Sequence, residues 1–564
     1  MTHERDITAE DTLARFDGGL ILDAQKQLST GPAISSMEQC KEYILPLQQH
    51  IGVISQPLIR TGDRVLKGQM LARPGDLVSA AIHSPVSGVV TDIRQHEVPH
   101  ASGLSDLCVF IENDFKDEWL EREPLGDDYN NTSSSNMRKV VRDAGIVGLG
   151  GAVFPAAVKQ TEMNVRTLIL NGVECEPYIT CDDVLMREHA EDVIAGADII
   201  GHIIKARQCV VAIEDNKPEA IQAIQSVIDK DGTGFFKIRV IPTLYPSGGE
   251  KQLIKIITGE EVPKGRYPAE LGVLVHNVAT AVAIQRAVYH DEPLISRILT
   301  VTGNGVRQPQ NIEVLIGTPM SACIEHCGGY TEDSDELIMG GPMMGFSLQS
   351  DQLPVVKATN CLLVTADIEQ VKHKKHLPCI RCGKCVEVCP VRLLPQQLYW
   401  YASSKNTDRL IEHNLFDCIE CGCCAYVCPS EIPLVQYYRY AKTSIWQQER
   451  ERKASDLSRQ RHEAHQMRLD KIKREREDKL RKKRELLKKK TEAQNAADNK
   501  SDGDGSSDGK TSKQAAIAEA IARAHTKKAE RNKAAEQVNE TATTQSEAKT
   551  TPDKESSNTR ETDK

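Results

Sequence analysis

The sequence is poor in aromatic residues and lacks a long apolar run. Aromatic residues make up 4% of the 564 residues, and hydrophobic residues make up 40%. A membrane-spanning helix needs about 20 consecutive apolar residues. The best candidate, residues 271–289, is interrupted by His276, Asn277, Gln285 and Arg286. The sequence therefore predicts no transmembrane helix, and the acidic first residues, which have no apolar core, predict no secretory signal.

The C-terminal part lacks the residues that build a core. Residues 491–564 contain no aromatic residue and no leucine. They cannot bury enough apolar surface to offset the entropy of ordering, so they are predicted to be a disordered tail. Residues 447–490 carry Lys, Arg and Glu at i,i+4 spacing and are predicted to form a basic charged helix. Within them, residues 449–490 hold 18 Lys and Arg against 9 Asp and Glu.

The charge balance argues against nucleic acid as a partner. The whole chain has a formal net charge of −9. Its basic residues are concentrated in one segment, so the rest of the chain is strongly acidic. A body of that sign does not attract the phosphates of duplex DNA. We expect no nucleic-acid partner.

Four folded domains are expected before the charged helix, which gives a multidomain chain of α/β and α+β class. After a polar N-terminal lead-in over residues 1–30, residues 31–115 show short apolar runs with Gly and Pro at the turns. Residues 57–72 and 83–90 look like the two halves of a barrel-sandwich domain. This stretch resembles the biotinyl and lipoyl domains, which carry their group on a Lys between the halves. Residues 73–81 contain no Lys, so a structural or docking domain is expected.

The central residues alternate between two kinds of periodicity. Residues 136–292 place short apolar strands between segments of helical period, which is α/β patterning. Residues 293–350 return to short strands with Gly-rich turns, and a small β-rich domain is expected there. The expected strands are 167–171, 209–213, 237–241 and 298–302, and the expected helices are 220–228 and 279–289.

Cysteines point to iron–sulfur clusters. All 17 cysteines precede residue 429, and the motif C-x₂-C-x₂-C-x₃-C-P occurs at 379–390 and again at 418–429. In a two-cluster ferredoxin, three closely spaced thiolates bind one [4Fe–4S] cube and the fourth Cys ligates the other cube. A ferredoxin domain with two [4Fe–4S] clusters is therefore predicted over residues 370–440. The predicted ligands are Cys379, Cys382, Cys385 and Cys428 for cluster 1, and Cys389, Cys418, Cys421 and Cys424 for cluster 2.

Zinc is the rival metal, since paired C-x₂-C motifs also bind it. A zinc site does not require two motifs with four cysteines each, or a proline after the last cysteine of each motif. The cluster interpretation is therefore favoured. Cys423 breaks the x₂ spacing from Cys421. We interpret it as a neighbour of the cluster and not as a ligand.

A Gly-rich segment, residues 145–159, precedes a helix-like stretch. Glycines allow close approach of the backbone to a ligand, and a helix N-terminus attracts phosphate. The segment is not a G-x-G-x-x-G motif after a strand, so a dinucleotide-binding Rossmann fold is not predicted. Three further segments, 171–178, 245–251 and 275–280, combine Gly, Asn and Glu near strand ends.

These four segments resemble those of the flavin- and NADH-binding subunit of respiratory complex I. Residues 148–159 are similar to its G-x-G-G-A-x-F-P-x-x-x-K loop and residues 171–177 to its N-A-D-E-x-E-P segment. Residues 248–253 are similar to G-E-E-T-A-L and residues 275–280 to V-N-N-V-x-T. The chain departs from the pattern at Val173, where the family has Asp, and at Gly249, where it has Glu.

The resemblance implies a set of flavin and nucleotide contacts. Flavin mononucleotide would be held by Gly148, Gly150, Gly151, Lys159, Asn171, Glu174, Asn277 and Thr280. Glu176, Gly248, Glu250 and Lys251 would line the rim. Phe154 would stack on the nicotinamide of NADH, and Phe154 and Glu174 are the candidate catalytic residues. That family continues into a β-grasp domain, which fits residues 293–350.

The order of domains resembles that of the C subunits of Rnf-type, or Rsx-type, ion-translocating electron transport complexes. The resemblance implies a peripheral electron-entry component on the cytoplasmic side of the cell inner membrane. Its partners would be the other subunits of the complex, NADH, and a ferredoxin or similar redox protein. Two alternatives stay open: an iron–sulfur relay without flavin, and a docking scaffold whose clusters are structural.

Overall fold

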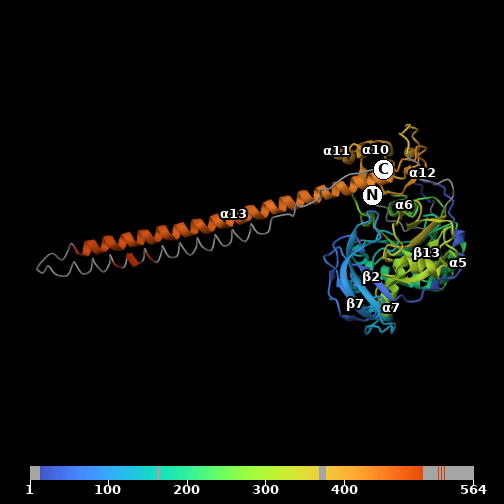
Figure 1. The fold of residues 1–564 in the computed structure, drawn as a ribbon, viewed down its shortest axis with the longest axis horizontal. Coiled ribbons are helices and arrows are strands. Elements are labelled where there is room, and N and C mark those ends of the chain that lie inside the picture. Colours follow the sequence, from blue (N-terminus) through green and yellow to red (C-terminus); the bar gives the residue numbers. More distant parts are fainter. Residues whose placement is uncertain are drawn as a thin grey trace, which may run out of the picture. The chain divides into compact units, whose positions relative to one another are not determined.

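The computed structural model describes residues 13–161, 165–366 and 376–498, together with positions 519, 522, 523 and 526 (Figure 1). The chain divides into two units, Met1–Glu451 and Arg452–Lys564. None of the helices in the described ranges combines the length and the apolar character that crossing a bilayer requires. The folded domains all lie in the first unit.

Two small antiparallel sheets form the first domain. One has the order β2-β8-β7-β4 and the other the order β3-β5-β6. Val65, Leu71, Val90 and Ile111 are fully buried in the core that these strands share. The strands are β2 (Glu42–Pro46), β3 (Gln56–Pro57), β4 (Arg64–Val65), β5 (Met70–Arg73), β6 (Ile82–His83), β7 (Gly88–Glu97) and β8 (Ser105–Asn113).

A four-stranded parallel sheet forms the second domain, in the order β11-β10-β9-β12. Each of the strands and helices expected between residues 167 and 289 is present. The strands are β9 (Thr167–Gly172), β10 (Gln208–Glu214), β11 (Phe236–Ile241) and β12 (Val273–Asn277). The helices are η2 (Gly126–Asn131), α1 (Ser134–Asp143), α2 (Ala156–Lys159), α3 (Cys181–Glu188), α4 (Ala190–Ile204), α5 (Pro218–Asp231), α6 (Glu250–Thr258), η3 (Pro268–Leu271) and α7 (Val278–His290).

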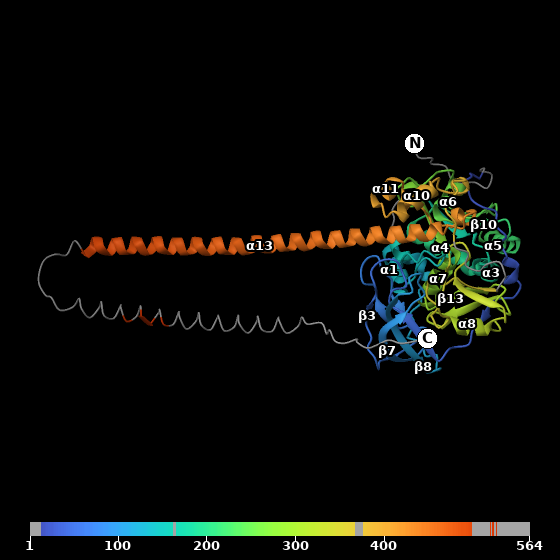
Figure 2. The ribbon, with the colours of Figure 1, turned by 45° about the horizontal axis from the view of Figure 1, so that its top comes forward.

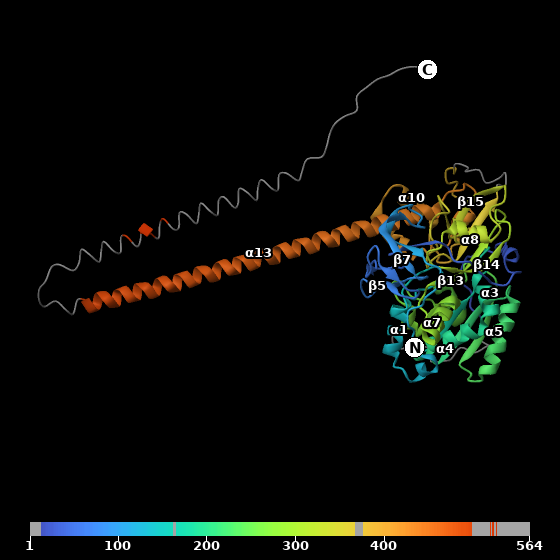
Figure 3. The same cartoon turned by 60° about the horizontal axis from the view of Figure 1, so that its bottom comes forward.

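Helices cover both faces of this sheet. Leu168 and Leu170 of β9 enter the core shared with the mutually packed helices α3, α4, α5 and α7 (Figure 3). Ile169 points to the opposite face and packs with Leu253 and Ile254 of α6. The alternation follows from the two-residue period of a strand. Because β10 and β12 flank β9 on opposite sides, the strand order reverses between β9 and β12, and ligands bind at such a reversal in open α/β sheets.

The third domain is a mixed sheet of six strands, in the order β1-β14-β13-β17-β15-β16. The strand expected at 298–302 lies within β13. Residues Leu299, Val314 and Leu362 are buried in its core beside Ile324 of α8. The elements are β1 (Ser35–Ser36), β13 (Ser296–Thr302), β14 (Gln310–Leu315), α8 (Met320–His326), β15 (Ser334–Met339), β16 (Phe346–Ser347) and β17 (Cys361–Ala366).

The N-terminal segment is built into the fold. Leu20 exchanges backbone hydrogen bonds with Tyr245, at 2.8 and 2.9 Å, and the N–H of Gly19 donates to the carbonyl of Val388 at 3.1 Å. Lys26, in the short helix η1 (Lys26–Leu28), is buried. The prediction of a polar lead-in over 1–30 is therefore wrong for residues 13–30, while residues 1–12 lie outside the described ranges. Phe16 is what draws the segment in, since it packs into the apolar core beneath α6.

The cysteine-rich domain contacts the segment that follows α6 of the second domain, at one end of the first unit (Figures 1 and 2). Arg392 forms an ion pair with Glu261, at 3.1 Å, and Lys264 hydrogen-bonds Asn414. The elements are α9 (Lys384–Glu387), α10 (Pro395–Ser403), α11 (Thr407–Glu412), η4 (Leu415–Asp417), α12 (Cys423–Tyr426) and α13 (Leu434–Asp498).

Helix α13 is longer than predicted. It has 65 residues and starts at Leu434, because Leu434, Tyr438 and Ile445 are buried in the ferredoxin core. It is helical through Asp498, the last residue of this described range, so the prediction of a disordered tail from residue 491 is wrong for 491–498. Beyond Asp498 that prediction falls outside the described residues, apart from four isolated positions.

Candidate functional site

The motif cysteines line two separate cavities. One is lined by the thiols of Cys379, Cys382, Cys385 and Cys428. The other is lined by Cys389, Cys418, Cys421 and Cys424, with Cys423 beside them. Each set takes three cysteines from one motif and the fourth from the other motif, which is the grouping that the spacing predicts. Thiolate-only donor sets of this kind fit [4Fe–4S] clusters.

The separation of the thiols does not fit zinc. Four thiolates around one zinc ion at about 2.3 Å lie about 3.8 Å apart. Within the described ranges, only Glu174, Cys181 and Asp182 form a group of three or more donors that all lie within 4.8 Å of one another. Neither cysteine set closes around a single ion, so the spread of the thiols suits the larger cube.

The loop of cluster 2 packs against the second domain. The hydroxyl of Tyr245 donates to the carbonyl of Cys421 at 2.6 Å. A Cβ on Gly422 would lie 2.7 Å from the carbonyl of Met343, so only glycine allows this approach. Tyr245, Cys421 and Cys423 form one buried cluster. Cys423 therefore lines the cavity of cluster 2 and also packs in the buried cluster with Tyr245 of the second domain.

Two asparagines mark the ends of β9 and β12. Asn171 and Asn277 are register partners at the carboxyl edge, where the strand order reverses. The Nδ2 of Asn171 donates to the carbonyl of Gly248 at 3.0 Å. The Nδ2 of Asn277 donates to Asp182 at 2.6 Å, while its Oδ1 accepts from the N–H of Ala279 and caps α7. The fold thus brings two predicted flavin residues together at the favoured edge of the sheet.

The Gly-rich loop reaches the same edge. The N–H of Gly148 donates to the carbonyl of Phe154 at 2.9 Å, which closes the loop and leaves Phe154 half-buried. A Cβ on Gly150 would lie 3.3 Å from Asn277, and Gly151 has a φ of +103° with open space around its Cα. The hydroxyl of Thr280 accepts from the N–H of Leu149 at 2.9 Å. Backbone of the loop is therefore held against the Asn277 side chain.

Lys159 differs from its predicted setting. It is the last residue of a single-turn helix, α2, whereas the sequence predicted that it closes the Gly-rich segment at the start of a helix. Its Nζ lies 2.6 Å from Glu250 and donates to the carbonyl of Val275 at 2.6 Å. The ammonium thus joins β12 to the first turn of α6, and its charge is already opposed by a carboxylate.

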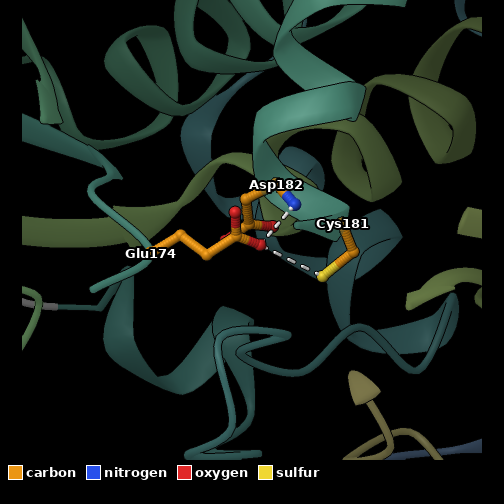
Figure 4. A group of neighbouring side chains, drawn as sticks. All are labelled: Glu174, Cys181 and Asp182. Carbon is orange, nitrogen blue, oxygen red and sulfur yellow. Dashed lines mark hydrogen bonds between the residues drawn. The ribbon is translucent and has the colours of Figure 1, made fainter. Parts of the chain in front are cut away.

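Glu174 and Glu176 both accept backbone N–H groups. Glu174 takes the N–H of Asp182 at 2.7 Å and caps α3, and the thiol of Cys181 lies 3.5 Å from it (Figure 4). Glu176 accepts from Met343 and Met344 of the third domain at 2.8 and 2.9 Å. Burial raises the pKa of Glu176, and these N–H groups partly oppose that shift.

Asp182 and Lys26 are functional candidates that sequence reasoning missed. Burial, followed by the charge of Glu174, raises the pKa of Asp182, which also accepts the bond from Asn277. The ammonium of Lys26 donates to the carbonyls of Glu174, Glu176 and Ile179 at 2.8, 3.1 and 2.6 Å. Lys26 carries no motif, and a lysine in a polar N-terminal segment gives no signal of this role.

Three residues close in sequence to the predicted flavin contacts have buried polar atoms without a hydrogen-bond partner in the part of the chain that the structure describes. Gln160 follows Lys159, Gln252 lies in the first turn of α6, and His276 precedes Asn277. Each has a buried side-chain polar atom with no hydrogen-bond partner among the described residues. Such groups are costly unless a partner satisfies them, although His276, which is next to Asn277 in β12, points to the opposite face of the sheet. The residues that fit a polar ligand such as a flavin nucleotide are the amides of Asn171 and Asn277 and the open backbone at Gly151.

Four known domain families match this chain, and the matched ranges follow the domains seen in the structure. Residues 14–116 match the "RnfC Barrel sandwich hybrid domain" and residues 141–286 the "Nuo51 FMN-binding domain". Residues 298–347 match the "SLBB domain" and residues 378–432 the "4Fe-4S dicluster domain". The expected fold class is confirmed, and the chain carries domains for FMN and for two [4Fe–4S] clusters.

Curated relatives share one description, that of the C subunit of an ion-translocating oxidoreductase complex. A relative from Vibrio cholerae is 46% identical over 86% of this chain and 62% of its own length. One from Haemophilus influenzae is 43% identical over 82% of this chain and 72% of its own length. The chain thus spans about three fifths of the Vibrio relative. Among solved structures, an NAD⁺-reducing [NiFe]-hydrogenase matches 52% of this chain and 55% of its own, with 20% identity and a TM-score of 0.38.

Proposed function

The chain belongs to the family of C subunits of ion-translocating oxidoreductase complexes, and on that premise we propose that it is the electron-entry component of such a complex. In this proposal NADH delivers electrons at the edge formed by β9 and β12. They leave through the ferredoxin domain to membrane partner subunits or to a ferredoxin-like protein. The protein would lie peripherally on the cytoplasmic side of the inner membrane. FMN would convert a hydride into single electrons, and the clusters would carry those electrons.

One observation carries the proposal: the loop of cluster 2 touches the domain that ends in the Asn171 edge. Tyr245 donates to the Cys421 carbonyl at 2.6 Å. Three residues further along, Gly248 accepts from Asn171 at 3.0 Å and donates to the thiol of Cys175 at 3.3 Å. A short, bonded path therefore joins the flavin edge to a cluster ligand, as electron transfer between the two domains requires.

Each group of residues has its own task in this proposal. Asn171, Asn277 and the backbone of Gly150 and Gly151 would hold the flavin. Glu174 fixes α3 and keeps Asp182 in place. The raised pKa of Asp182 would let this buried carboxyl hold a proton beside Asn277. Lys26 fixes the backbone of the segment that carries Glu174 and Glu176.

The test is made on protein purified without oxygen. We expect about eight iron and eight sulfide per chain, one FMN released on denaturation, and cluster absorption that bleaches on addition of NADH. Lys159→Ala should lower flavin retention, because it opens the contact between β12 and α6, and Glu174→Gln should slow reduction by NADH. Lys139→Ala and Glu191→Gln, at exposed positions, are the matched controls.

The same measurements separate the alternatives. Clusters without flavin, even after incubation with FMN, would support an iron–sulfur relay. The ion pair of Lys159 with Glu250 is the observation that favours this second candidate, because it leaves no free ammonium for a phosphate at that position. Clusters that strong reductants cannot reduce would support a scaffold instead.

A further inference from the structure

The ferredoxin domain consists of two halves with nearly identical loops. Gly383 and Gly422 precede α9 and α12 with φ, ψ of 83°, −14° and 82°, −13°. One position before the second cysteine of each motif, Arg381 and Glu420 both have a φ of 59°. The two loops therefore present equivalent surfaces, and the surroundings of one can be compared position by position with those of the other.

The cluster 2 loop is covered. Cys421 is buried, and Ile419 packs in the cluster around Tyr245. Gly422 is pressed against the Met343 carbonyl. The charge of Glu420 is matched by Arg439 at 3.0 Å and by Lys442 at 2.7 Å. The cluster 2 loop is therefore in contact with other parts of the chain at Ile419, Glu420 and Gly422.

The cluster 1 loop is open at the equivalent positions. Ile380 is 67% exposed where Ile419 is packed. Cys382 is the only exposed cysteine among the described residues, and a Cβ on Gly383 would meet nothing within 4 Å. Arg381 and Lys384 are exposed, and neither forms an ion pair with any residue that the structure describes. Leu377, 63% exposed, lies beside them through its bond to Ser430 near Cys428.

We propose that this open loop face, formed by Leu377, Ile380, Arg381, Cys382 and Lys384, is the docking surface for an acidic one-electron carrier protein. The proposal rests on the proposed function, since it assigns the exit of the same cluster pair. One electron leaves the reduced cluster 1 site and reduces the oxidised carrier by one electron, with no proton or bond exchanged. Electrons thus enter the ferredoxin domain at the covered loop and leave it at the open loop.

The chemistry of the face selects the partner. Between Leu377 and Glu387, the exposed Arg381 and Lys384 outnumber the single exposed acid, Glu387, so the loop has a net positive charge. Charges at the rim of an interface steer encounter with a partner of opposite sign. Two exposed aliphatic side chains beside an exposed ligand thiol give a small apolar centre. Small, weak interfaces of this kind are typical of electron-transfer encounters.

The experiment uses the full chain, reduced with dithionite so that it does not depend on flavin or NADH. The probe is an oxidised acidic plant-type [2Fe–2S] ferredoxin. Its reduction rate is measured by stopped flow and its affinity by titration, at several salt concentrations. The variants are Arg381→Glu and Lys384→Glu, with Lys41→Glu as the control of equal charge change on the barrel-sandwich domain. Arg381→Glu is compatible with the backbone, because Glu420 occupies the same conformation in the other loop.

For the wild type, the rate should fall as salt rises. Arg381→Glu should lower association with the probe about tenfold and flatten the salt dependence, while iron content stays unchanged. Redox titration measures the potential of cluster 1 in each variant, because a charge reversal beside a ligand shifts it. Lys41→Glu should behave as wild type. Equal rates and affinities in wild type and Arg381→Glu would overturn the proposal. So would a rate that rises when the chain is cut after Glu451, or self-association lost in Arg381→Glu, because the tail or a second copy would then be the occupant. Failure of NADH to reduce the clusters would instead count against the proposed function alone.

Discussion

At the residue scale, the two cysteine motifs have the most specific consequences. Their spacing alone predicts which thiols share a site, because a loop with C-x₂-C-x₂-C can cap only three corners of one cube. The structure places the eight cysteines in two cavities with that division. Cys423 adjoins Cys424 and lines the second cavity as well, so its role rests on the spacing of the motif.

Substitution of single cysteines tests the ligand sets. Cys385→Ala should remove cluster 1 and leave about half of the iron and sulfide, since three of its four thiols cannot hold an intact cube firmly. Cys423→Ala should keep both clusters, because Cys418, Cys421, Cys424 and Cys389 still complete the second site. The measurements are iron, sulfide and the EPR signals of the reduced protein. Loss of cluster 2 in Cys423→Ala would make Cys423 the ligand in place of a neighbour.

The buried carboxyl of Asp182 predicts a pH dependence. Burial and the charge of Glu174 raise its pKa in the folded chain from the usual 3.8 to about 7. Between those two values the folded chain binds more protons than the unfolded chain, so the free energy of unfolding falls as pH rises. Asp182→Asn removes this dependence, and its stability relative to wild type should be greater at pH 8 than at pH 5. Urea unfolding at both pH values is the measurement, with Asp333→Asn at an exposed position as control.

At the scale of single elements, sequence periodicity predicted the strands and helices well and the ends of helices poorly. The strands β9, β10, β11 and β13 were found because apolar runs between turns are a local signal. The length of α2 and the start of α13 were not found, because both depend on tertiary contacts. Lys159 ends α2 where its ammonium meets Glu250, and α13 starts early where Tyr438 enters the ferredoxin core.

The contact between Tyr245 and the cluster 2 loop can be tested by removing a single hydroxyl group. Tyr245→Phe removes a hydroxyl whose proton points at the Cys421 carbonyl, 2.6 Å away. That dipole favours added negative charge nearby, so its loss should make the potential of cluster 2 more negative and leave cluster 1 unchanged. Tyr438→Phe is the matched control, because its hydroxyl lies in the same cavity wall but donates to Pro395 at 2.6 Å. Redox titration followed by EPR separates the two clusters. An equal shift in both variants would mean that neither hydroxyl acts specifically on the loop.

At the scale of the whole molecule, the order of domains could be predicted from the sequence and their contacts could not. Composition, motif and resemblance are local properties, and each identified one domain. The contacts between domains depend on single residues that no motif marks, such as Lys26. Lys357 is a further example, since its buried ammonium donates to Ala81 of the first domain and Gly145 of the second at 2.7 and 2.6 Å. Only the folded chain brings those carbonyls together.

The boundary between the two units gives the last prediction. The sequence placed the end of the folded part near Gln447, and the first unit runs to Glu451. Trp446 still contacts Phe416, with ring centroids 5.6 Å apart, and Ile445 is buried in the ferredoxin core. Beyond them the described side chains of α13 are almost all exposed. A chain that ends after Glu451 should therefore keep its iron content and melting temperature, since it loses almost no buried surface.

A shorter chain shows where the core begins. Ending the chain after Tyr437 removes Tyr438, Ala441 and Ile445, which are 1%, 5% and 3% exposed. Removal of large buried side chains costs about 2–5 kcal/mol each, which is comparable with the stability of a small domain. This chain should lose both clusters, whereas the chain ending at Glu451 should keep them. Iron per chain and calorimetric melting compare the two, with the first three domains as an internal reference. If both chains lose iron, the exposed part of α13 must stabilise the ferredoxin domain through contacts outside the first unit.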